Sequence, residues 1–320
     1  MVAMAYDPEV YRAFLDIIGV IKLPQEVFCR PGFVRQDHGD CAERAATACP
    51  GTVQGRTAPA GGVKRGEGAH MSVVLVHGNP ETIAVWDPLR AALDRDDIVC
   101  LSPPGFGAPV PDGWGATVED YRDWLISELE AMESPVDLVG HDWGGGHVVA
   151  VAMKRPDLLR SWSTDVIGIF DAEYVWHDLA QLWQTPGAGE EAVEAWASES
   201  VDERAARLQT FGITLDVATK LAQGYDKTMA SCILTLYRSA AQPKMAQLGE
   251  GLAAATQRPG LHLSATDDPF VGAIELQRRA AERAGARIEI LDGLGHWWMV
   301  QDPQRGATAL QRFWSSLDNA

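Results

Sequence analysis

The chain has 320 residues, of which 46% are hydrophobic, and its 27 basic and 44 acidic side chains give a formal charge of −17. This length and hydrophobicity allow a substantial buried core, in one large domain or two ordinary ones. The negative charge argues against nucleic acid or an anionic membrane as a partner, since either requires a basic surface.

The cysteines and the hydropathy bear on where the protein resides. The five cysteines are odd in number, and no two of them have C-x-x-C spacing. This argues against a disulfide framework or a zinc site and favours a reducing compartment. The N-terminus lacks a basic segment followed by an apolar run, and no stretch reaches membrane-spanning length. These features predict a soluble, cytoplasmic protein.

Residues 1–60 differ in character from the rest of the chain. Residues 6–19, "YDPEVYRAFLDIIG", are compatible with one helix, but residues 30–70 are rich in Gly, Ala, Pro and Arg and show little periodicity. We therefore predict an irregular N-terminal extension over residues 1–60. Alternatively, residues 56–68 contain edge strands that belong to the core.

From Met71 onward, apolar runs alternate with helical patterns. The runs are "SVVLVH", "DIVCLS", "VDLVGH", "SWSTDVIGI", "GLHLSA" and "ARIEILDG". Helical patterns such as "TVEDYRDWLISELEAM" and "FVGAIELQRRAAERAG" separate most of them. Strands that are apolar throughout and alternate with helices predict an α/β fold with a mostly parallel, doubly wound sheet. Residues 171–250 are helical, Trp-rich and free of strand patterns, which predicts a helical cap inserted between core segments 61–170 and 251–320.

The run "VDLVGH" leads into a Gly-rich turn at Asp142. The pattern from Gly140 to Gly144 has the spacing of the nucleophile elbow G-x-S-x-G, with Asp in place of Ser. In a parallel sheet, reactive groups lie at the carboxyl ends of the strands. An aspartate at a strand-to-helix turn can also simply cap the helix. The flanking glycines favour a nucleophile, provided that catalytic partners exist.

Candidate partners follow the later strands. His296 stands in "DGLGHWWM", and Asp267 and Asp268 stand in "SATDDPF". The order nucleophile, acid, histidine is that of the α/β hydrolases. Asp268 is preferred because it directly precedes "PF" as the loop leaves the strand, with Asp267 as the alternative and Asp165 as a weaker substitute. "HGNPETIAVW" follows the first strand, so the amides of Asn79 and Trp143 can form an oxyanion hole, unless "HGNP" is only a tight turn.

Residues 71–320 resemble the α/β-hydrolase superfamily, and specifically its Asp-nucleophile branch of epoxide hydrolases and haloalkane dehalogenases. The resemblance rests on "HGNPE", "PPGFG", "GHDWGG", "DDPF" and "GLGHWW", in that order. It implies that Asp142 attacks a saturated carbon to form an alkyl ester, which water activated by His296 then hydrolyses. Asp268 orients the imidazole, and neither a metal nor an organic cofactor is required.

The leaving group separates the two chemistries of this branch. An epoxide oxygen leaves as an alkoxide and needs a donor from the cap. Tyr237 resembles the ring-opening tyrosine of epoxide hydrolases, and His177 or Tyr174 is the candidate second donor. A halide leaves as a stable anion, and Asn79 and Trp143 match the pair that holds it in many haloalkane dehalogenases.

The most favoured function is therefore an epoxide hydrolase that yields vicinal diols, with haloalkane dehalogenase second and a non-catalytic binding protein third. "GHWW" is more similar to the epoxide branch. Trp143 stands where fluoroacetate dehalogenases usually carry arginine, which disfavours a small carboxylate substrate. With 11 tryptophans in the chain, we expect an apolar pocket and a small apolar substrate. A homo-oligomer is compatible with the sequence.

Overall fold

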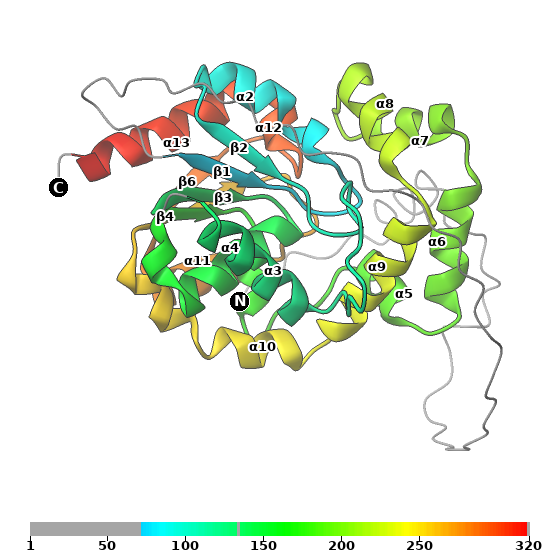
Figure 1. Cartoon of the computed structure of the whole chain (residues 1–320), viewed down its shortest axis with the longest axis horizontal. Helices are drawn as coiled ribbons and strands as arrows, with labels where there is room; N and C mark the ends of the chain where they lie inside the picture. Colours follow the sequence, from blue (N-terminus) through cyan, green and yellow to red (C-terminus); the bar gives the residue numbers. More distant parts are fainter. Residues whose placement is uncertain (1–71, 133–134, 319–320) are drawn as a thin grey trace, which may run out of the picture. The chain divides into compact units, whose positions relative to one another are not determined.

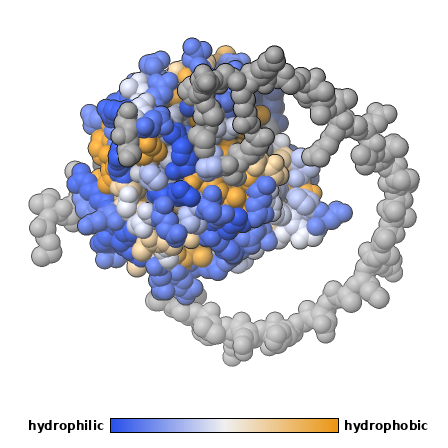
Figure 2. Space-filling view, turned by 60° about the vertical axis from the view of Figure 1, so that its left-hand side comes forward, coloured by the Kyte–Doolittle hydropathy of each residue, from blue (hydrophilic) through white to orange (hydrophobic). Residues whose placement is uncertain are grey.

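The computed structural model describes residues 72–132 and 135–318. The predicted extension 1–60, its helix 6–19 and the alternative strands at 56–68 lie outside these residues, as do the first residues of core segment 61–170. In the described part of the chain, no helix is long and apolar enough to span a membrane. Figure 2 shows a face on which hydrophilic residues surround patches of hydrophobic ones.

Six parallel strands form one sheet in the order β2-β1-β3-β4-β5-β6 (Figure 1). Their bounds are Val73–Val76 (β1), Ile98–Leu101 (β2), Val136–Gly140 (β3), Leu159–Thr164 (β4), Gly260–Ala265 (β5) and Ala286–Leu291 (β6). Strands β1, β3 and β5 are buried along their whole length, as expected for strands covered on both faces. The predicted parallel, doubly wound sheet is confirmed.

Helices cover both faces of the sheet, and the pleat of β1 shows how. Val74 and Val76 pack in one hydrophobic cluster with α3, α4 and α11, whereas Val73 and Leu75 pack in another with α2 and α13. Figure 1 shows these two sets of helices on opposite sides of the sheet. Their bounds are Asp87–Leu93 (α2), Val118–Glu130 (α3), Trp143–Lys154 (α4), Ile274–Arg283 (α11), Trp298–Gln301 (α12) and Pro303–Asp318 (α13).

The segment between β4 and β5 is helical throughout its described elements. Its helices are Asp178–Gln184 (α5), Ala188–Ser198 (α6), Val201–Gln209 (α7), Leu215–Gly224 (α8), Lys227–Ser239 (α9) and Lys244–Gly249 (α10). Side chains of His177, Ser200 and Asp226 accept amide hydrogens at the starts of α5, α7 and α9. Helices α5, α6 and α9 pack on one another, and α7 packs on α8.

Two predicted elements end earlier or begin later than expected. The run 161–169 was predicted as one strand, but β4 ends at Thr164 and a 3-10 helix, η3, follows at Ile167–Phe170. The Thr164 hydroxyl accepts the Val166 amide hydrogen, which turns the chain out of the sheet. The helix predicted from residue 270 begins only at Ile274, because Gly272 has a φ of 78°.

Candidate active site

Asp142 lies at a sharp turn between β3 and α4. Its φ of 49° and ψ of −129° are rare for a residue with a side chain. The neighbouring glycines permit the turn: a Cβ at Gly144 would lie 2.2 Å from the Val76 carbonyl oxygen, and one at Gly140 would lie 2.4 Å from the Gly144 carbonyl oxygen. The Asp142 side chain makes no capping hydrogen bond to α4, so the geometry contradicts the helix-cap interpretation.

The structure brings Asp142, His296 and Asp268 together. Asp268 follows β5 and His296 follows β6, and His296 Nδ1 lies 2.8 Å from Asp268 Oδ2. His296 Nε2 lies 3.7 Å from Asp142 Oδ2. Asp267 is exposed and accepts a hydrogen bond from Thr266 instead. Of the two adjacent acids, only Asp268 therefore orients the imidazole.

Electrostatics match these groups to a nucleophile and a base. Burial raises the pKa of Asp142 to about 6, although the charges of His296 and His141 oppose the rise. Burial acts to lower the pKa of His296, but the charges of Asp268 and Asp142 outweigh it and hold that pKa above its ordinary value. Near neutral pH Asp142 is thus mostly ionised, and the raised pKa makes His296 a stronger base than an ordinary imidazole.

The two oxygens of Asp142 have different surroundings. Oδ1 accepts the backbone amide hydrogen of Asn79 at 3.0 Å, and Oδ2 faces His296. Asn79 follows β1, which pairs with β3 in parallel, so both loops leave the same edge of the sheet. The Trp143 amide is the first of α4, a group that helix geometry leaves without an intrahelical partner. This arrangement allows Oδ2 to act as an attacking atom while Oδ1 is held by a backbone amide.

A buried charged network lies beneath the nucleophile. His141 Nδ1 lies 2.6 Å from Asp165 Oδ2, and His141 Nε2 lies 3.1 Å from Glu81 Oε1. Burial acts to lower the pKa of His141, but the two carboxylates hold it well above its ordinary value. The indole of Trp297 donates to Glu81 at 2.5 Å and that of Trp298 donates to Asp165 at 2.8 Å. The two tryptophans that follow His296 thus each donate one hydrogen bond to a buried carboxylate.

This network gives Asp165 a role other than the one the sequence suggested. Asp165 Oδ1 accepts the backbone amide hydrogen of Asp142 at 3.0 Å. It contacts the elbow and His141 rather than His296, so the geometry does not support it as the triad acid. Sequence reasoning missed Glu81 and His141 altogether. The available signal was a histidine directly after one buried strand, beside Asp142, and a glutamate in "HGNPE", in the loop that follows another.

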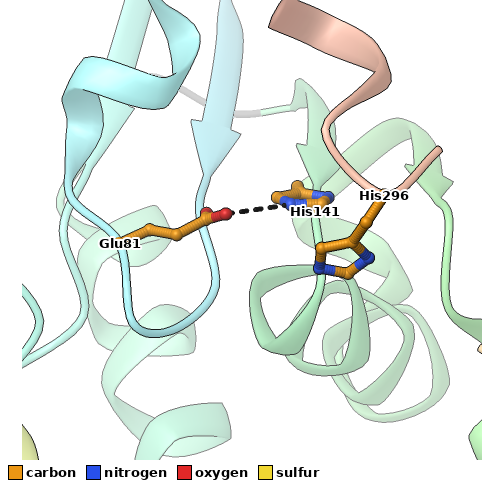
Figure 3. Close-up of side chains that lie close together, drawn as sticks. All are labelled: Glu81, His141 and His296. Carbon is orange, nitrogen blue, oxygen red and sulfur yellow. Dashed lines mark hydrogen bonds and ion pairs between the residues drawn. The ribbon is translucent and has the colours of Figure 1, made fainter. Parts of the chain in front are cut away.

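Glu81, His141 and His296 also place potential metal-ligating atoms within 4.8 Å of one another. Figure 3 shows Glu81 pointing at His141, with the His296 ring beside it. Both nitrogens of His141 are hydrogen-bonded to carboxylates, so both carry protons and neither has a lone pair for a metal. The ring centroids of His141 and His296 are 4.5 Å apart. This cluster is an ion-pair network rather than a metal centre.

Cap and core residues line a mostly apolar pocket over Asp142, with a cavity volume of about 80 Å³. Asn79 and His296 line it from the core. Cap residues that line it include Leu179, Trp183, Trp196, Leu208, Phe211 and Leu221. This apolar lining with a few polar groups suits a small organic substrate.

Tyr237 presents a hydroxyl to this cavity from helix α9. The side chain is buried, and its ring packs against Trp143, Trp176 and Trp183 with centroids 5.4, 5.5 and 4.8 Å apart. Burial and the Asp142 charge hold the pKa of Tyr237 well above its ordinary value. The hydroxyl therefore stays protonated and can donate a hydrogen bond.

His177 lines the same cavity at the start of α5. Its Nδ1 accepts the Ala180 amide hydrogen at 3.2 Å, so the neutral ring carries its proton on Nε2. Burial lowers the pKa of His177 to about 3. The imidazole is thus a neutral hydrogen-bond donor across the ordinary pH range.

Two further predicted residues have different surroundings. The Tyr174 hydroxyl donates to the Phe270 carbonyl at 2.8 Å, which disfavours it as the second donor. The buried side-chain oxygen and nitrogen of Asn79 have no hydrogen-bond partner among residues 72–132 and 135–318. The backbone amide of Asn79 contacts Asp142 Oδ1, and its side chain lies beside the Tyr237 hydroxyl.

The sheet, the elbow and the order of the acidic and histidine loops together define an α/β-hydrolase fold. The chain belongs to the Alpha/beta hydrolase family, whose sequence model matches residues 73–309.

The chain is also similar to several characterised proteins and solved structures. It is 24% identical over 258 residues to the (E)-2-((N-methylformamido)methylene)succinate hydrolase of Acinetobacter baylyi, covering 78% of this chain and 91% of that one. The crystal structure of E-2-(acetamidomethylene)succinate hydrolase matches with a TM-score of 0.60 and 19% identity, over 77% of this chain and 91% of that chain. At this identity, the likeness shows the fold alone.

Two shorter matches are to proteins with other activities. Haloalkane dehalogenase 2 of Mycobacterium bovis is 32% identical over 98 residues, which is 29% of this chain and 34% of the relative. An epoxide hydrolase of Caballeronia sordidicola is 32% identical over 101 residues, 30% of each chain. The matched region thus spans about a third of the length of these two relatives. The reaction of this protein therefore has to be inferred from the geometry of its candidate site.

Proposed function

We propose that this protein hydrolyses epoxides to vicinal diols through an alkyl ester of Asp142. The observation that carries the proposal is that Tyr237 and His177 line the same cavity as Asp142. An epoxide oxygen leaves as a strongly basic alkoxide, so its departure needs a hydrogen-bond donor. The two donors belong to the cap and the nucleophile belongs to the core, so a substrate in the cavity lies between them.

In the first step, Asp142 Oδ2 attacks one ring carbon and the carbon–oxygen bond of the ring breaks. Tyr237 gives its proton to the departing oxygen, and the N–H of His177 supports the developing charge. An aspartate suits this step because a saturated carbon offers no carbonyl to a serine. The product is an alkyl ester whose carbonyl oxygen, Oδ1, already accepts the Asn79 amide hydrogen.

In the second step, His296 takes a proton from water, and the resulting hydroxide attacks Cγ of Asp142. Negative charge develops on Oδ1, where the amide of Asn79 and the start of α4 stabilise it. Asp268 stabilises the imidazolium. The ester bond breaks, and the departing alkoxide takes the proton of the hydroxyl group now on Cγ, which gives the diol and restores the Asp142 carboxylate. The proton on His296 passes to the Tyr237 phenolate through solvent.

A haloalkane dehalogenase is the second candidate, and the side chain of Asn79 favours it. Its buried nitrogen has no partner in the described residues and lines the cavity beside Asp142. Together with the Trp143 indole, it forms a pair that suits a halide leaving as an anion. The partial match to haloalkane dehalogenase 2 of Mycobacterium bovis supports the same alternative.

A parallel assay separates the candidates. Purified protein is incubated with styrene oxide and with 1-bromohexane, and diol and bromide are quantified. We expect diol without bromide. Bromide without diol would establish the dehalogenase instead, and neither product from either substrate would favour a binding protein that keeps the fold.

A further inference from the structure

Two arginines lie in the otherwise apolar wall of the active-site cavity. Arg204 and Arg207 belong to α7 of the cap, three residues apart and so on the same face of the helix. Both are only partly exposed. Placing a guanidinium charge in an apolar wall is unfavourable unless the charge is paired. The surroundings of each arginine therefore indicate what the cavity binds.

Arg204 is held rigidly but not neutralised. Its Nε donates to the Ala222 carbonyl at 3.1 Å, and its Nη1 donates to the carbonyls of Trp196 and Glu199. The guanidinium also lies over the Tyr225 ring, 5.8 Å from its centroid. Within residues 72–132 and 135–318, no carboxylate pairs with Arg204, and its Nη2 has no hydrogen-bond partner.

Arg207 shares this wall and has one carboxylate partner. Its Nη2 forms an ion pair with Glu199, and its guanidinium lies 5.2 Å from the centroid of the Trp196 ring. Of the two arginines, only Arg207 forms an ion pair within residues 72–132 and 135–318. The guanidinium of Arg204 is bonded to backbone carbonyls alone, although the chain as a whole is strongly acidic.

A continuous run of aromatic rings joins the arginines to the ring-opening tyrosine. Tyr225 contacts Trp196, Trp196 contacts Trp183, and Trp183 contacts Tyr237, with centroid separations of 5.9, 5.7 and 4.8 Å. Trp196, Tyr225 and Trp183 all line the cavity. A ligand that spans this run has a hydrocarbon chain between its reacting group and its anionic group.

We propose that the substrate is an epoxide on a hydrocarbon chain that ends in a carboxylate, and that Arg204 and Arg207 bind this carboxylate. The planar fork of a guanidinium matches the two oxygens of a carboxylate. This inference rests on the proposed function for the reaction, but the anion site itself does not depend on it. It replaces the expectation of a purely apolar substrate with an amphiphilic one.

Binding tests the site without chemistry. Decanoate and 1-decanol are titrated against the full chain while the fluorescence of the tryptophans is followed. We expect decanoate to bind more tightly, and the Arg204→Met variant to lose that preference by roughly ten- to a hundred-fold, the effect of one charge-assisted hydrogen bond. Arg204→Lys, which keeps the charge, should retain part of it. Arg278→Met, an exposed arginine of α11 outside the cavity, is the control and should keep the full preference.

Turnover provides the second measurement. The ratio of kcat/KM for 9,10-epoxystearate to that for its methyl ester should exceed one and fall in Arg204→Met but not in Arg278→Met. Equal binding of decanoate and decanol by the wild-type chain overturns the inference, even where styrene oxide is hydrolysed. Arg204-dependent decanoate binding without hydrolysis of any epoxide sustains the anion site and overturns the proposed reaction instead.

Discussion

At the scale of single residues, the asymmetry of Asp142 explains why an aspartate stands at the elbow. One oxygen accepts the Asn79 amide hydrogen, and the other faces His296. In the hydrolysis of the ester, the amide holds the oxygen that gains charge. A serine at this position has a single oxygen and cannot divide these roles. Under the proposed reaction, the residue type follows from displacement at a saturated carbon.

Removing the base should stop the reaction at the ester. We expect His296→Gln to accumulate a covalent adduct with the substrate, because loss of a general base typically slows a step by about a hundred- to ten-thousand-fold. Intact-mass analysis measures the adduct. The double variant Asp142→Ala, His296→Gln is the control and should gain no mass. Full turnover by the single variant would contradict the mechanism.

The pKa of Asp142 sets the acid limit of ester formation. Its carboxylate form is the nucleophile, so the rate of ester formation should rise with pH through about 6, the pKa raised by burial. The charge of His296 lowers this pKa, and the midpoint should therefore move above 6 in His296→Gln. Stopped-flow measurement of tryptophan quenching across pH 4–8 gives both midpoints. A midpoint near 4 in wild type would show that burial does not act on this group.

The donor variants decide between the leaving groups. Tyr237→Phe should lower epoxide turnover by roughly a hundred- to ten-thousand-fold, the usual contribution of a general acid. His177→Gln should lower the residual rate, since the ring donates through Nε2. Asn79→Ala should have a smaller effect, because the ester uses only its backbone amide. Unchanged turnover in Tyr237→Phe, together with a large loss of turnover in Asn79→Ala, would identify a dehalogenase.

At the scale of secondary-structure elements, local patterns predict strands and helices but not the contacts among them. The apolar runs correctly indicated six strands, and the Gly-rich turn correctly preceded α4. The network of Glu81, His141 and Trp297 joins residues 60 and 216 positions apart, a relation that no local pattern contains. The strand end at Thr164 was also missed: its hydroxyl accepts the nearby Val166 amide hydrogen, and Asp165 bonds to residues at the end of β3.

The junction of β3 and α4 makes a prediction about stability. A Cβ at Gly144 would lie 2.2 Å from the Val76 carbonyl oxygen, and backbone atoms cannot move aside as a flexible side chain can. Gly144→Ala should therefore lower the free energy of unfolding by about 1–3 kcal/mol or more, as overpacking does. In the same helix, a Cβ at Gly146 first meets the end of the Ile169 side chain at 3.3 Å. Gly146→Ala is the matched control and should be much milder in urea unfolding.

At the scale of the whole molecule, the cap is inserted in the chain between two strands that pair with each other in the sheet. It leaves after β4 and returns before β5, and these strands are neighbours in the sheet. Asp171 lies at the start of the inserted segment and is buried, and it accepts two hydrogen bonds from Arg279 of α11, at 2.6 and 2.7 Å. The cap is thus tied to the core at its root while its far helices form the cavity wall.

This tie should contribute stability that depends on pH. Arg279→Met leaves the Asp171 carboxylate buried without its partner, and we expect the free energy of unfolding to fall. The hydrogen bonds from Arg279 lower the pKa of Asp171 below its ordinary value of 3.8. A carboxylate with a lowered folded-state pKa stabilises above its unfolded pKa and loses that contribution as the pH falls through the folded one. The difference between wild type and Arg279→Met should therefore be full at pH 6 and shrink below about pH 4.

The adjacent Arg278→Met removes the same charge from the same helix and is the control, because within residues 72–132 and 135–318 Arg279 and not Arg278 pairs with Asp171. Urea unfolding of the three proteins at several pH values measures both the difference and its window. A deficit in Arg279→Met that equals that of Arg278→Met, or that grows as the pH falls, would contradict the ion pair as the source of the stability. A deficit that closes on acidification would show that the root of the cap is held by the charge of Asp171, because packing alone has no reason to vary in that pH range.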